Sequence, residues 1–289
     1  MTAGSHTAAA TPKRSVRTRR IRFEYPTGSL DRHYVDRDLV MSHVVAVLSA
    51  TFPEGEDFFV RSVRRYADAV TDPELKKQVA GFIGQEVTHG REHRELNERL
   101  QQMGYPTRFV DRQVRKSLAR AERLTPGLHC LAATAALEHY TAALAEKLLT
   151  DERAQALLGE TEVRNMLLWH ALEESEHKAV AFDVYRAAGG SERRRIAVMR
   201  IVTVGFLTRV ILYTTISLLK DRATYNPIRL IRSLWALRTS PFLARDMIAR
   251  IREYNQVGFH PDQNDNSELV ERWSAELFGA EGQLADHLR

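Results

Sequence analysis

Two copies of the pattern Glu-x-x-His occur in the chain, each within a stretch of helical character. Glu86 and His89 form the first copy, and Glu174 and His177 form the second. Residues three or four positions apart lie on one face of a helix, so the two side chains of each pair project together. Carboxylate and imidazole groups are common ligands of divalent metals. Each copy can therefore offer two ligands to a metal ion.

Two isolated glutamates, Glu56 and Glu138, lie on other helical segments, one before each Glu-x-x-His pair. A helical bundle in which two helices each give one Glu and two others each give Glu-x-x-His is the arrangement of di-iron and di-manganese carboxylate sites. Four buried carboxylates would be prohibitively unfavourable unless cations neutralised them. The sequence thus predicts two bound divalent metal ions, with iron favoured and manganese or zinc as alternatives.

Two further histidines share the faces of these pairs. His93 lies seven residues after Glu86, and His170 lies four residues before Glu174. We expect His93 to be either a ligand or a hydrogen-bond partner of one, and His170 to be either a ligand or a buried core histidine. The candidate metal-binding and catalytic residues are Glu56, Glu86, His89, Glu138, His170, Glu174 and His177, with His93 as an additional metal candidate.

Neighbouring acids compete for some of these roles. Glu174 is preferred over Glu173 and Glu176 because it alone lies three residues before His177 and four after His170. Glu56 shares a helix face with apolar residues, which favours it over its neighbours. The remaining candidates are Glu54 and Asp57 as rivals of Glu56, and Asp183 and Tyr140 as hydrogen-bond partners of the ligands.

Helices must position these residues, because apolar side chains recur at steps of three and four from Asp38 onward. Pro53 and Gly55 predict a break in the first helical stretch, and Asp72 followed by Pro73 predicts a helix start. The fold class predicted is all-α: a ferritin-like antiparallel four-helix bundle with extra C-terminal helices. The expected helices are Leu39–Leu48, Phe58–Val70, Leu75–Leu100, Val110–Leu124, Leu128–Leu149 and Val163–Ala187.

Charge divides the 289 residues, whose formal net charge is +5, into four regions. We expect a disordered basic tail over residues 1–22, the metal-binding bundle over 23–190, an apolar and basic helical extension over 191–256, and a polar acidic tail with a short helix over 257–289. Composition is that of a globular protein. The single cysteine, Cys130, excludes a disulfide framework and a Cys-based zinc site, and favours a cytoplasmic location.

Residues 201–219 are apolar, and Arg209 is their one charged residue. Three interpretations follow: a buried helix packed on the bundle, a helix on a membrane surface, or a true membrane span. Residues 191–252 carry 13 basic and 3 acidic residues, which favours contact of residues 196–254 with an anionic membrane surface, peripheral to the inner membrane. Arg209 near mid-bilayer argues against a span. No nucleic-acid recognition motif appears, and a homodimer is a further option.

The stretches around Glu56, Glu86 and His170–Asp183 resemble a bacterial family described as predicted metal-dependent hydrolases, over roughly residues 23–219. The order of ligands is also similar to that of di-iron 4-aminobenzoate N-oxygenases, which place a histidine four residues before the last Glu-x-x-His glutamate. His170, Glu174 and His177 match that pattern. This second resemblance implies seven protein ligands and does not extend to substrate residues.

Three functions are compatible with this chemistry. The favoured one is an O2-activating di-iron oxygenase or oxidase, which would need an electron donor and would act on a small hydrophobic or amine substrate. The first alternative is a hydrolase that uses a metal-bridging hydroxide. The second is a non-enzymatic iron-binding or membrane-associated protein, and the large apolar C-terminal region argues against a storage-shell subunit.

Overall fold

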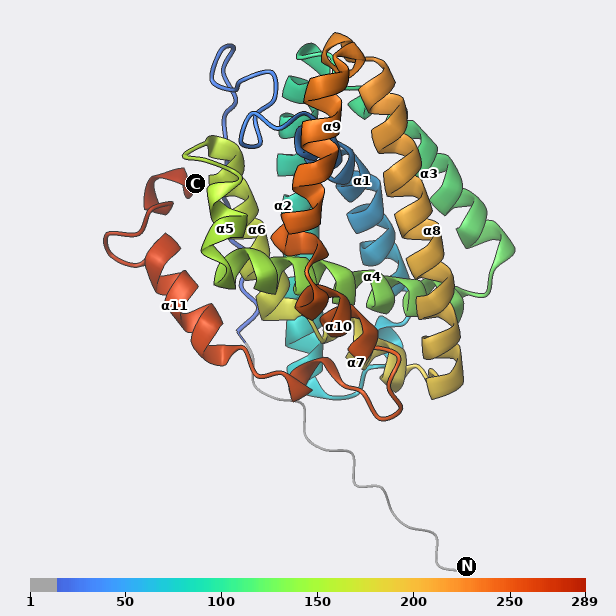
Figure 1. The fold of residues 1–289 in the computed structure, drawn as a ribbon. Coiled ribbons are helices and arrows are strands. Elements are labelled where there is room, and N and C mark those ends of the chain that lie inside the picture. The colour runs from blue at the N-terminus through green and yellow to red at the C-terminus, as the bar shows by residue number, and fades with distance from the viewer. Residues whose placement is uncertain (1–14) are drawn as a thin grey trace, which may run out of the picture.

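The computed structural model describes residues 15–289, and this part of the chain is all-helical, which confirms the predicted all-α class. One isolated β-bridge joins Ile21 to Leu288 within the described range. The helices, labelled in Figure 1, are α1 (Leu39–Arg64), α2 (Pro73–Gln102), α3 (Thr107–Leu124), α4 (Gly127–Thr150), α5 (Glu152–Ala156), α6 (Glu162–His177), α7 (Val180–Ala187), α8 (Glu192–Leu219), α9 (Pro227–Ala236), α10 (Arg245–Glu253) and α11 (Ser267–Phe278).

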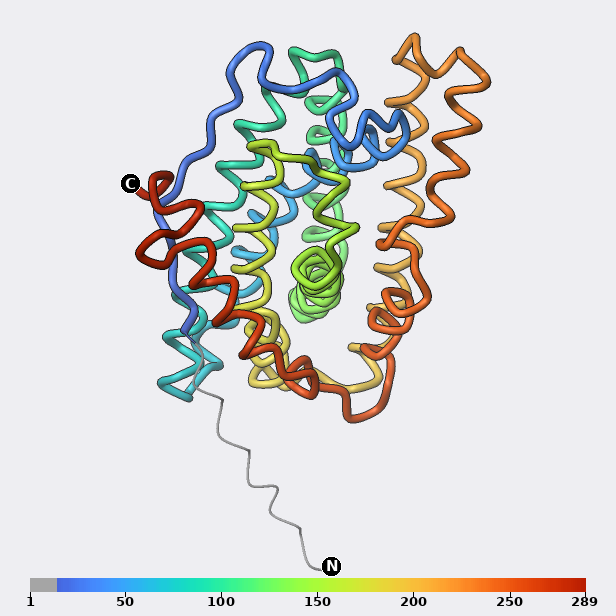
Figure 2. Tube along the Cα trace, turned by 60° about the vertical axis from the view of Figure 1, so that its left-hand side comes forward, coloured from blue at the N-terminus to red at the C-terminus, as the bar shows by residue number. Residues whose placement is uncertain are grey.

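Helices α1, α2, α4 and α6 surround the centre of the molecule. Helix α2 returns antiparallel to α1 and packs on it, and α6 packs on both α2 and α4. Helix α4 lies across the other three, and Figure 2 looks almost along its axis while α2 and α6 run lengthwise. Small side chains allow helices to approach closely at a steep crossing, and α4 supplies them on its buried side as Ala132, Ala135, Ala136, Ala142 and Ala143.

Helix α1 continues through Pro53, so the predicted break at Pro53 and Gly55 is wrong. Proline has no N–H and cannot donate to the carbonyl oxygen four residues earlier, which here belongs to Ser49. The amide of Asn97 on α2 replaces this donor, with 2.9 Å between Nδ2 and the Ser49 carbonyl oxygen. The Ser49 carbonyl oxygen of α1 therefore has a donor despite the proline. The helix continues past Pro53 to Glu56, which is buried in the core.

The helix expected over residues 163–187 is divided in two, because α6 ends at His177 and α7 begins at Val180. Lys178 occupies the break and donates to the backbone oxygen of Asn264, with Nζ 2.5 Å from it. The short α7 packs on both α2 and α4. His177 therefore lies in the last turn of α6, directly before a change of chain direction.

The segment before α1 is ordered against the bundle from residue 15, which corrects the prediction of a disordered tail reaching residue 22. Ile21 is fully buried, and the backbone of Arg22 donates to His287. Residues 1–14 of that predicted tail lie outside the described residues. The C-terminal region contains the expected short helix, α11, and anchors it through the buried Trp273 and Leu277.

Helices α8 and α9 form an outer layer on one side of the molecule (Figure 2). Helix α8 packs on α1 and α4, as one interpretation expected, but only 17 % of its apolar stretch is buried, so the expected burial is wrong. Within the described residues, α8 is also the one helix long and apolar enough to cross a membrane. The large exposed apolar side chains of this layer are Ile201, Val204, Leu207, Ile211, Leu212, Leu219, Ile228, Ile231, Leu234 and Trp235.

Candidate metal centre

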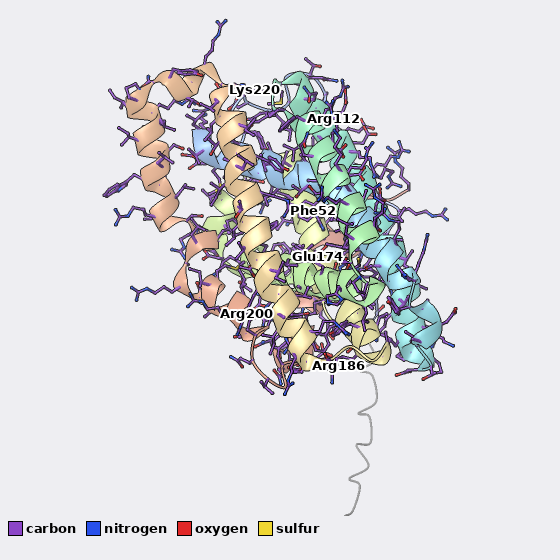
Figure 3. The ribbon with its side chains drawn as sticks, turned by 90° about the vertical axis from the view of Figure 1, so that its right-hand side faces the viewer. Phe52, Arg112, Glu174, Arg186, Arg200 and Lys220 are labelled. Carbon is purple, nitrogen blue, oxygen red and sulfur yellow. The ribbon has the colours of Figure 1, made fainter. Side chains whose placement is uncertain are left out.

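The seven predicted ligands converge in the core although they come from four helices. Glu56 is on α1, Glu86 and His89 on α2, Glu138 on α4, and the others on α6. Each is at most 4 % exposed. Figure 3 shows Glu174 in the middle of the bundle, between the long helices. The structure thus brings together every residue of the predicted set.

One group of ligand atoms surrounds His177. Its Nε2 atom lies 3.2 Å from Glu86 Oε1, 3.3 Å from Glu138 Oε2 and 3.4 Å from Glu174 Oε2. The first two of these glutamates form with His177 a cluster in which the three donor atoms lie within 4.8 Å of one another. This spacing suits the coordination of a single ion.

A second group surrounds the other oxygen of Glu174. Its Oε1 atom lies 2.9 Å from His170 Nε2 and 3.6 Å from His89 Nδ1. Glu56 approaches the same group, with Oε1 3.9 Å from His170 Nε2. Because the two oxygens of Glu174 face different histidines, its carboxylate can bridge two ions. Glu86 belongs to the cluster around His177 and to one with Glu56 and His89, so it can also bridge.

Apart from His170 Nε2 and Glu174 Oε1, which lie 2.9 Å apart as a hydrogen-bonded pair, the inward atoms of this centre have no hydrogen-bond partners, although buried polar atoms normally do. Such atoms would destabilise the fold unless a ligand satisfied them. Carboxylate oxygens and imidazole nitrogens that converge without donors between them fit divalent cations. The unpartnered atoms are both oxygens of Glu56, Glu86 and Glu138, together with Glu174 Oε2, His89 Nδ1 and His177 Nε2.

Outer hydrogen bonds set the tautomer of two histidines. His89 Nε2 lies 3.0 Å from Glu173 Oε2, and His177 Nδ1 lies 2.8 Å from the side-chain oxygen of Gln85. An oxygen of either kind accepts, so each of these ring nitrogens carries the proton. When the ring is neutral, its opposite nitrogen is unprotonated and faces the carboxylates, as metal ligation requires.

His93 belongs to a similar chain of hydrogen bonds, which ends at His170. The Ser49 hydroxyl donates to Asn97 Oδ1, so its oxygen accepts from His93 Nδ1 at 2.9 Å. His93 Nε2 is then an acceptor, and it lies 2.9 Å from His170 Nδ1. The other ring nitrogen of His170, Nε2, faces the centre and lies 2.9 Å from Glu174 Oε1, where a metal ion would take the place of that contact. Both ring nitrogens of His93 are engaged, which favours the interpretation of His93 as a hydrogen-bond partner over that of a ligand.

Arg19 anchors the outer partners, and the sequence analysis did not single it out. Its Nη1 lies 3.0 Å from Glu173 Oε1, and its Nη2 lies 2.6 Å from Glu176 Oε1. Glu176 also accepts from Gln85 Nε2 at 2.7 Å. The Arg19 guanidinium therefore binds the carboxylates of Glu173 and Glu176, the two acids that compete with Glu174 as ligands, outside the group of converging ligand atoms. The sequence offered a signal for the acceptor but not for Arg19: a ligating histidine needs an acceptor for its other ring nitrogen, and Glu173, beside one Glu-x-x-His pattern, accepts from His89 of the other.

A family model described as predicted metal-dependent hydrolase matches residues 17–265, which is most of the chain. The chain belongs to this family. No curated protein and no solved structure matches the chain. The family match begins just before Arg19 and includes all the converging ligands, so the metal dependence in its description agrees with the buried centre.

Burial makes three of the four ligand carboxylates of this predicted metal-dependent hydrolase family member harder to ionise. Burial, reinforced by the neighbouring carboxylates, raises the pKa of Glu56 and of Glu86 well above the usual range. Burial and the charge of Glu174 raise the pKa of Glu138 to about 7. Burial acts in the same direction on Glu174, but His177 and His170 outweigh it and hold its pKa well below the usual range.

The other candidates from the sequence lie outside the centre. Glu54 pairs with Arg115, whose Nε is 2.8 Å away, and Asp57 pairs with Arg94 at 2.6 Å. The two proposed outer partners are also engaged elsewhere: the Asp183 carboxylate lies 2.8 Å from His260 Nε2, and the Tyr140 hydroxyl donates to Thr203.

A second cluster, formed by His33, His43 and Asp221, has the spacing of a metal site. Its polar atoms, however, already have partners. Asp221 Oδ2 lies 2.9 Å from Arg32 Nη2 and within 3.2 Å of both histidines, and His33 Nδ1 accepts from Arg229 at 2.8 Å. Arginine supplies the positive charge here, so we interpret the cluster as a structural ion pair that fastens the end of α8 to α1.

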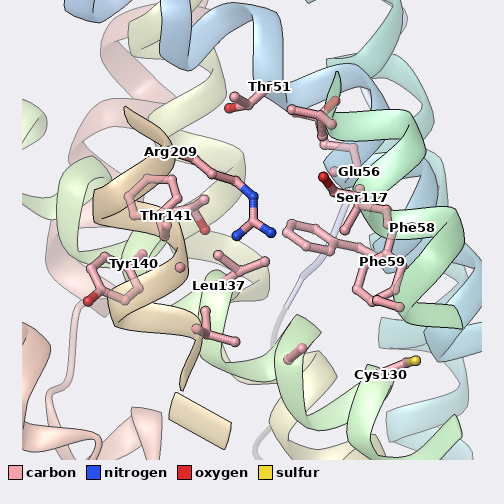
Figure 4. A pocket seen from close by; sticks show the side chains of 18 of the residues that line it. Thr51, Glu56, Phe58, Phe59, Ser117, Cys130, Leu137, Tyr140, Thr141 and Arg209 are labelled. Carbon is pink, nitrogen blue, oxygen red and sulfur yellow. The ribbon is translucent and has the colours of Figure 1, made fainter. Parts of the chain in front are cut away.

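A cavity of about 510 Å³ lies against the metal centre at Glu56, which forms part of its wall (Figure 4). That volume falls within the range of about 300–1,000 Å³ usual for small-molecule pockets. Most lining side chains are apolar, among them Phe58, Phe59, Leu137 and Phe206. Cys130 also lines the cavity as a small buried residue.

Proposed function

We propose that the chain binds two iron ions at this centre and is an O2-activating oxygenase or oxidase for a small hydrophobic or amine substrate. The observation that carries the proposal is the contact between a ligand set of four carboxylates and three imidazoles and an apolar cavity. An apolar cavity selects an apolar substrate and keeps bulk water from the reacting atoms.

Bound iron would supply O2 activation, with electrons from an external donor. The chain's own contribution is positioning. Glu173, Gln85 and His93 each fix one ligand imidazole, so that the unprotonated nitrogen faces the ions. Glu56 is the ligand that borders the cavity, and it lies between the substrate space and the other carboxylates. Phe58 and Phe59 beside it form an apolar wall against which a substrate packs.

The second candidate is a metal-dependent hydrolase, which the description of the family favours. Two divalent ions can activate water and polarise a carbonyl or phosphoryl group. The two clusters that share Glu86, together with Glu174, whose two oxygens face different histidines, suit this chemistry equally well. The apolar cavity restricts this candidate to esters or amides with a hydrophobic body.

Anaerobic loading with Fe(II) followed by exposure to O2 tests the proposal. We expect about two iron ions per chain and an absorption change that depends on O2 and is lost in Glu138→Gln. An iron-loaded sample whose spectrum does not respond to O2 would exclude the oxygenase. Turnover of hydrophobic esters by the Zn(II)- or Mn(II)-loaded protein, lost in the same variant, would instead support the hydrolase.

We also propose that the outer layer of α8 and α9 contacts an anionic membrane surface from the cytoplasmic side. Its apolar side chains are exposed, with Ile228 at 79 % and Trp235 at 66 %. The segment around them carries 13 basic and 3 acidic residues over 191–252. An apolar face flanked by cationic side chains complements acyl chains and anionic head groups together.

A further inference from the structure

Arg209 is the charged residue of the apolar stretch of α8, and it belongs to the cavity beside the metal centre. Figure 4 shows its guanidinium directed into the cavity, facing the region of Phe59 and Glu56. Within residues 15–289, no carboxylate forms an ion pair with it, whereas most arginines near the core have one. Its own side chain is exposed, so it marks the open end of the cavity.

The backbone of α8 makes room for this placement. Gly205 lies one helical turn before Arg209, and a Cβ atom at Gly205 would lie 2.8 Å from Arg209 Nη1. The guanidinium therefore lies along the helix in the space that the glycine leaves open.

The two ends of the cavity differ in chemistry. Arg209 stands at the exposed end, and Glu56, which is 1 % exposed, stands at the buried end against the metal centre. Between them the walls are largely apolar, with Phe59, Leu137 and Phe206 among the lining residues. A guanidinium offers a planar pair of N–H donors that matches a carboxylate or phosphate group.

We propose that the cavity binds an amphipathic substrate with a single anionic head group, which Arg209 pairs at the mouth while the apolar body extends inward to the metal centre. This proposal depends on the proposed function in one respect only: it calls the bound molecule a substrate. The binding geometry itself applies to the oxygenase and to the hydrolase alike.

A series of probes with one chain length tests the head group. Decanoate, decyl phosphate, decanol and decylamine would be titrated into the metal-loaded full chain by calorimetry. We expect the two anions to bind about tenfold or more tightly than decanol, because a charge-assisted hydrogen bond contributes about 1.5–3 kcal/mol. Decylamine should bind most weakly. Equal affinity for the anionic and cationic probes would overturn the proposal.

Arg209→Leu should remove the preference for anions over decanol while leaving decanol affinity nearly unchanged, and Arg209→Lys should retain part of the preference. Arg232→Leu is the matched control, because it removes one exposed positive charge of the same region outside the cavity. Loss of the preference in both leucine variants would show a general effect of net charge and would overturn the role of Arg209. Metal content and helical circular dichroism report that each variant is folded.

The orientation of the bound acid gives a second, independent test. In Mn(II)-loaded protein, the paramagnetic ion broadens the resonances of nearby nuclei. We expect the terminal ¹³C-methyl group of labelled decanoate to broaden more strongly than its ¹³C-carboxyl group. The reverse order would place the head group on the metal ions and would overturn the proposal. Neither experiment needs turnover, so absence of O2 reactivity would exclude the oxygenase without affecting this result.

Discussion

Arg19, from the segment before the first helix, forms an ion pair with Glu173 on α6, with 3.0 Å between Nη1 and Oε1. Glu173 in turn accepts the Nε2 proton of His89. Arg19, which is distant in sequence from every candidate ligand, thus helps to determine which ring nitrogen of His89 faces the metal centre. Arg19 is mostly buried, so this pair is far less screened than a surface salt bridge.

Removal of Arg19 should weaken metal binding without removing any ligand. Arg19→Ala leaves Glu173 and Glu176 buried without their cation, and loss of such outer support typically lowers metal affinity about 10–100-fold. Arg20→Ala, which alters an exposed neighbour, is the control. Competition with a chromogenic chelator measures both affinities. Equal affinities would show that the ion pair has no part in holding His89.

Glu138→Gln should have opposite effects on the two forms of the protein. Without metal, it replaces a buried carboxylate whose two oxygens have no partner, so the melting temperature should rise. With metal, it removes a ligand, so metal content and metal-dependent stabilisation should fall. Glu54→Gln, which alters a carboxylate paired with Arg115, is the control. Undiminished metal content in Glu138→Gln would remove this residue from the ligand set.

The replacement of a helical hydrogen bond at Pro53 predicts a coupling with Asn97. Asn97→Ala should destabilise the fold by about 1–3 kcal/mol, because the Ser49 carbonyl loses its donor. Pro53→Ala restores an N–H that can donate to the same carbonyl. The cost of Asn97→Ala should therefore be smaller in the Pro53→Ala background, as a double-mutant cycle by urea denaturation would measure. Strict additivity would contradict this explanation of the uninterrupted α1.

The hydrogen bond between His43 and Asp221 predicts a loss of stability in acid that is independent of the metal centre. Burial lowers the pKa of His43 to about 4 although Asp221 opposes the change, and for Asp221 hydrogen bonds outweigh burial and lower the pKa to about 2. Folding thus favours neutral His43, a contribution complete above pH 6.5 and lost as the pH falls towards 4. The contribution of Asp221 is present above pH 3.8 and disappears towards pH 2.

His43→Gln isolates the histidine, since an amide does not titrate. This variant should be less stable than the parent at pH 7, and the difference in melting temperature should shrink as the pH falls from about 6.5 to 4. Any loss of metal in acid affects both proteins and cancels in the difference. A difference that is constant over this interval would contradict the assigned cause.

Contact with a membrane predicts cosedimentation with anionic vesicles at low ionic strength and not with neutral ones. Ile228→Ser together with Ile231→Ser should reduce the bound fraction several-fold, because both side chains are exposed on α9. Val257→Ser is the control, since Val257 is 85 % exposed and lies outside α8 and α9. Equal binding by all three proteins would contradict the proposal. Concentration-dependent dimerisation that the double variant abolishes would instead assign the face to a second copy of the chain.

The sequence was most informative where spacing alone decides geometry. The three- and four-residue steps that link His170, Glu174 and His177 hold in any helix, and the structure brings them to one place. Their role as ligands stays a prediction. The fold class was equally accessible, because helical periodicity extends over most of the chain.

The features that the sequence did not reveal depend on contacts between distant segments. The continuity of α1 through Pro53 requires Asn97, which lies 44 residues further along the chain. The transverse course of α4 depends on how closely its alanines let other helices approach, and helical periodicity carries no crossing angle. In the sequence, Arg19 is one of several arginines in the N-terminal segment, and only its ion pair with Glu173 in the structure distinguishes it from them.

The pairing of the two ends of the described chain has a consequence for biogenesis. Ile21 bridges Leu288, and Arg19 needs Glu173 and Glu176. During synthesis the early residues leave the ribosome long before these partners exist, and such non-local contacts form late in folding. In the nascent protein, the four candidate ligand glutamates therefore lack part of their surroundings. Metal capture is expected to be a post-translational step, and the metal supply at that moment would decide how much protein matures.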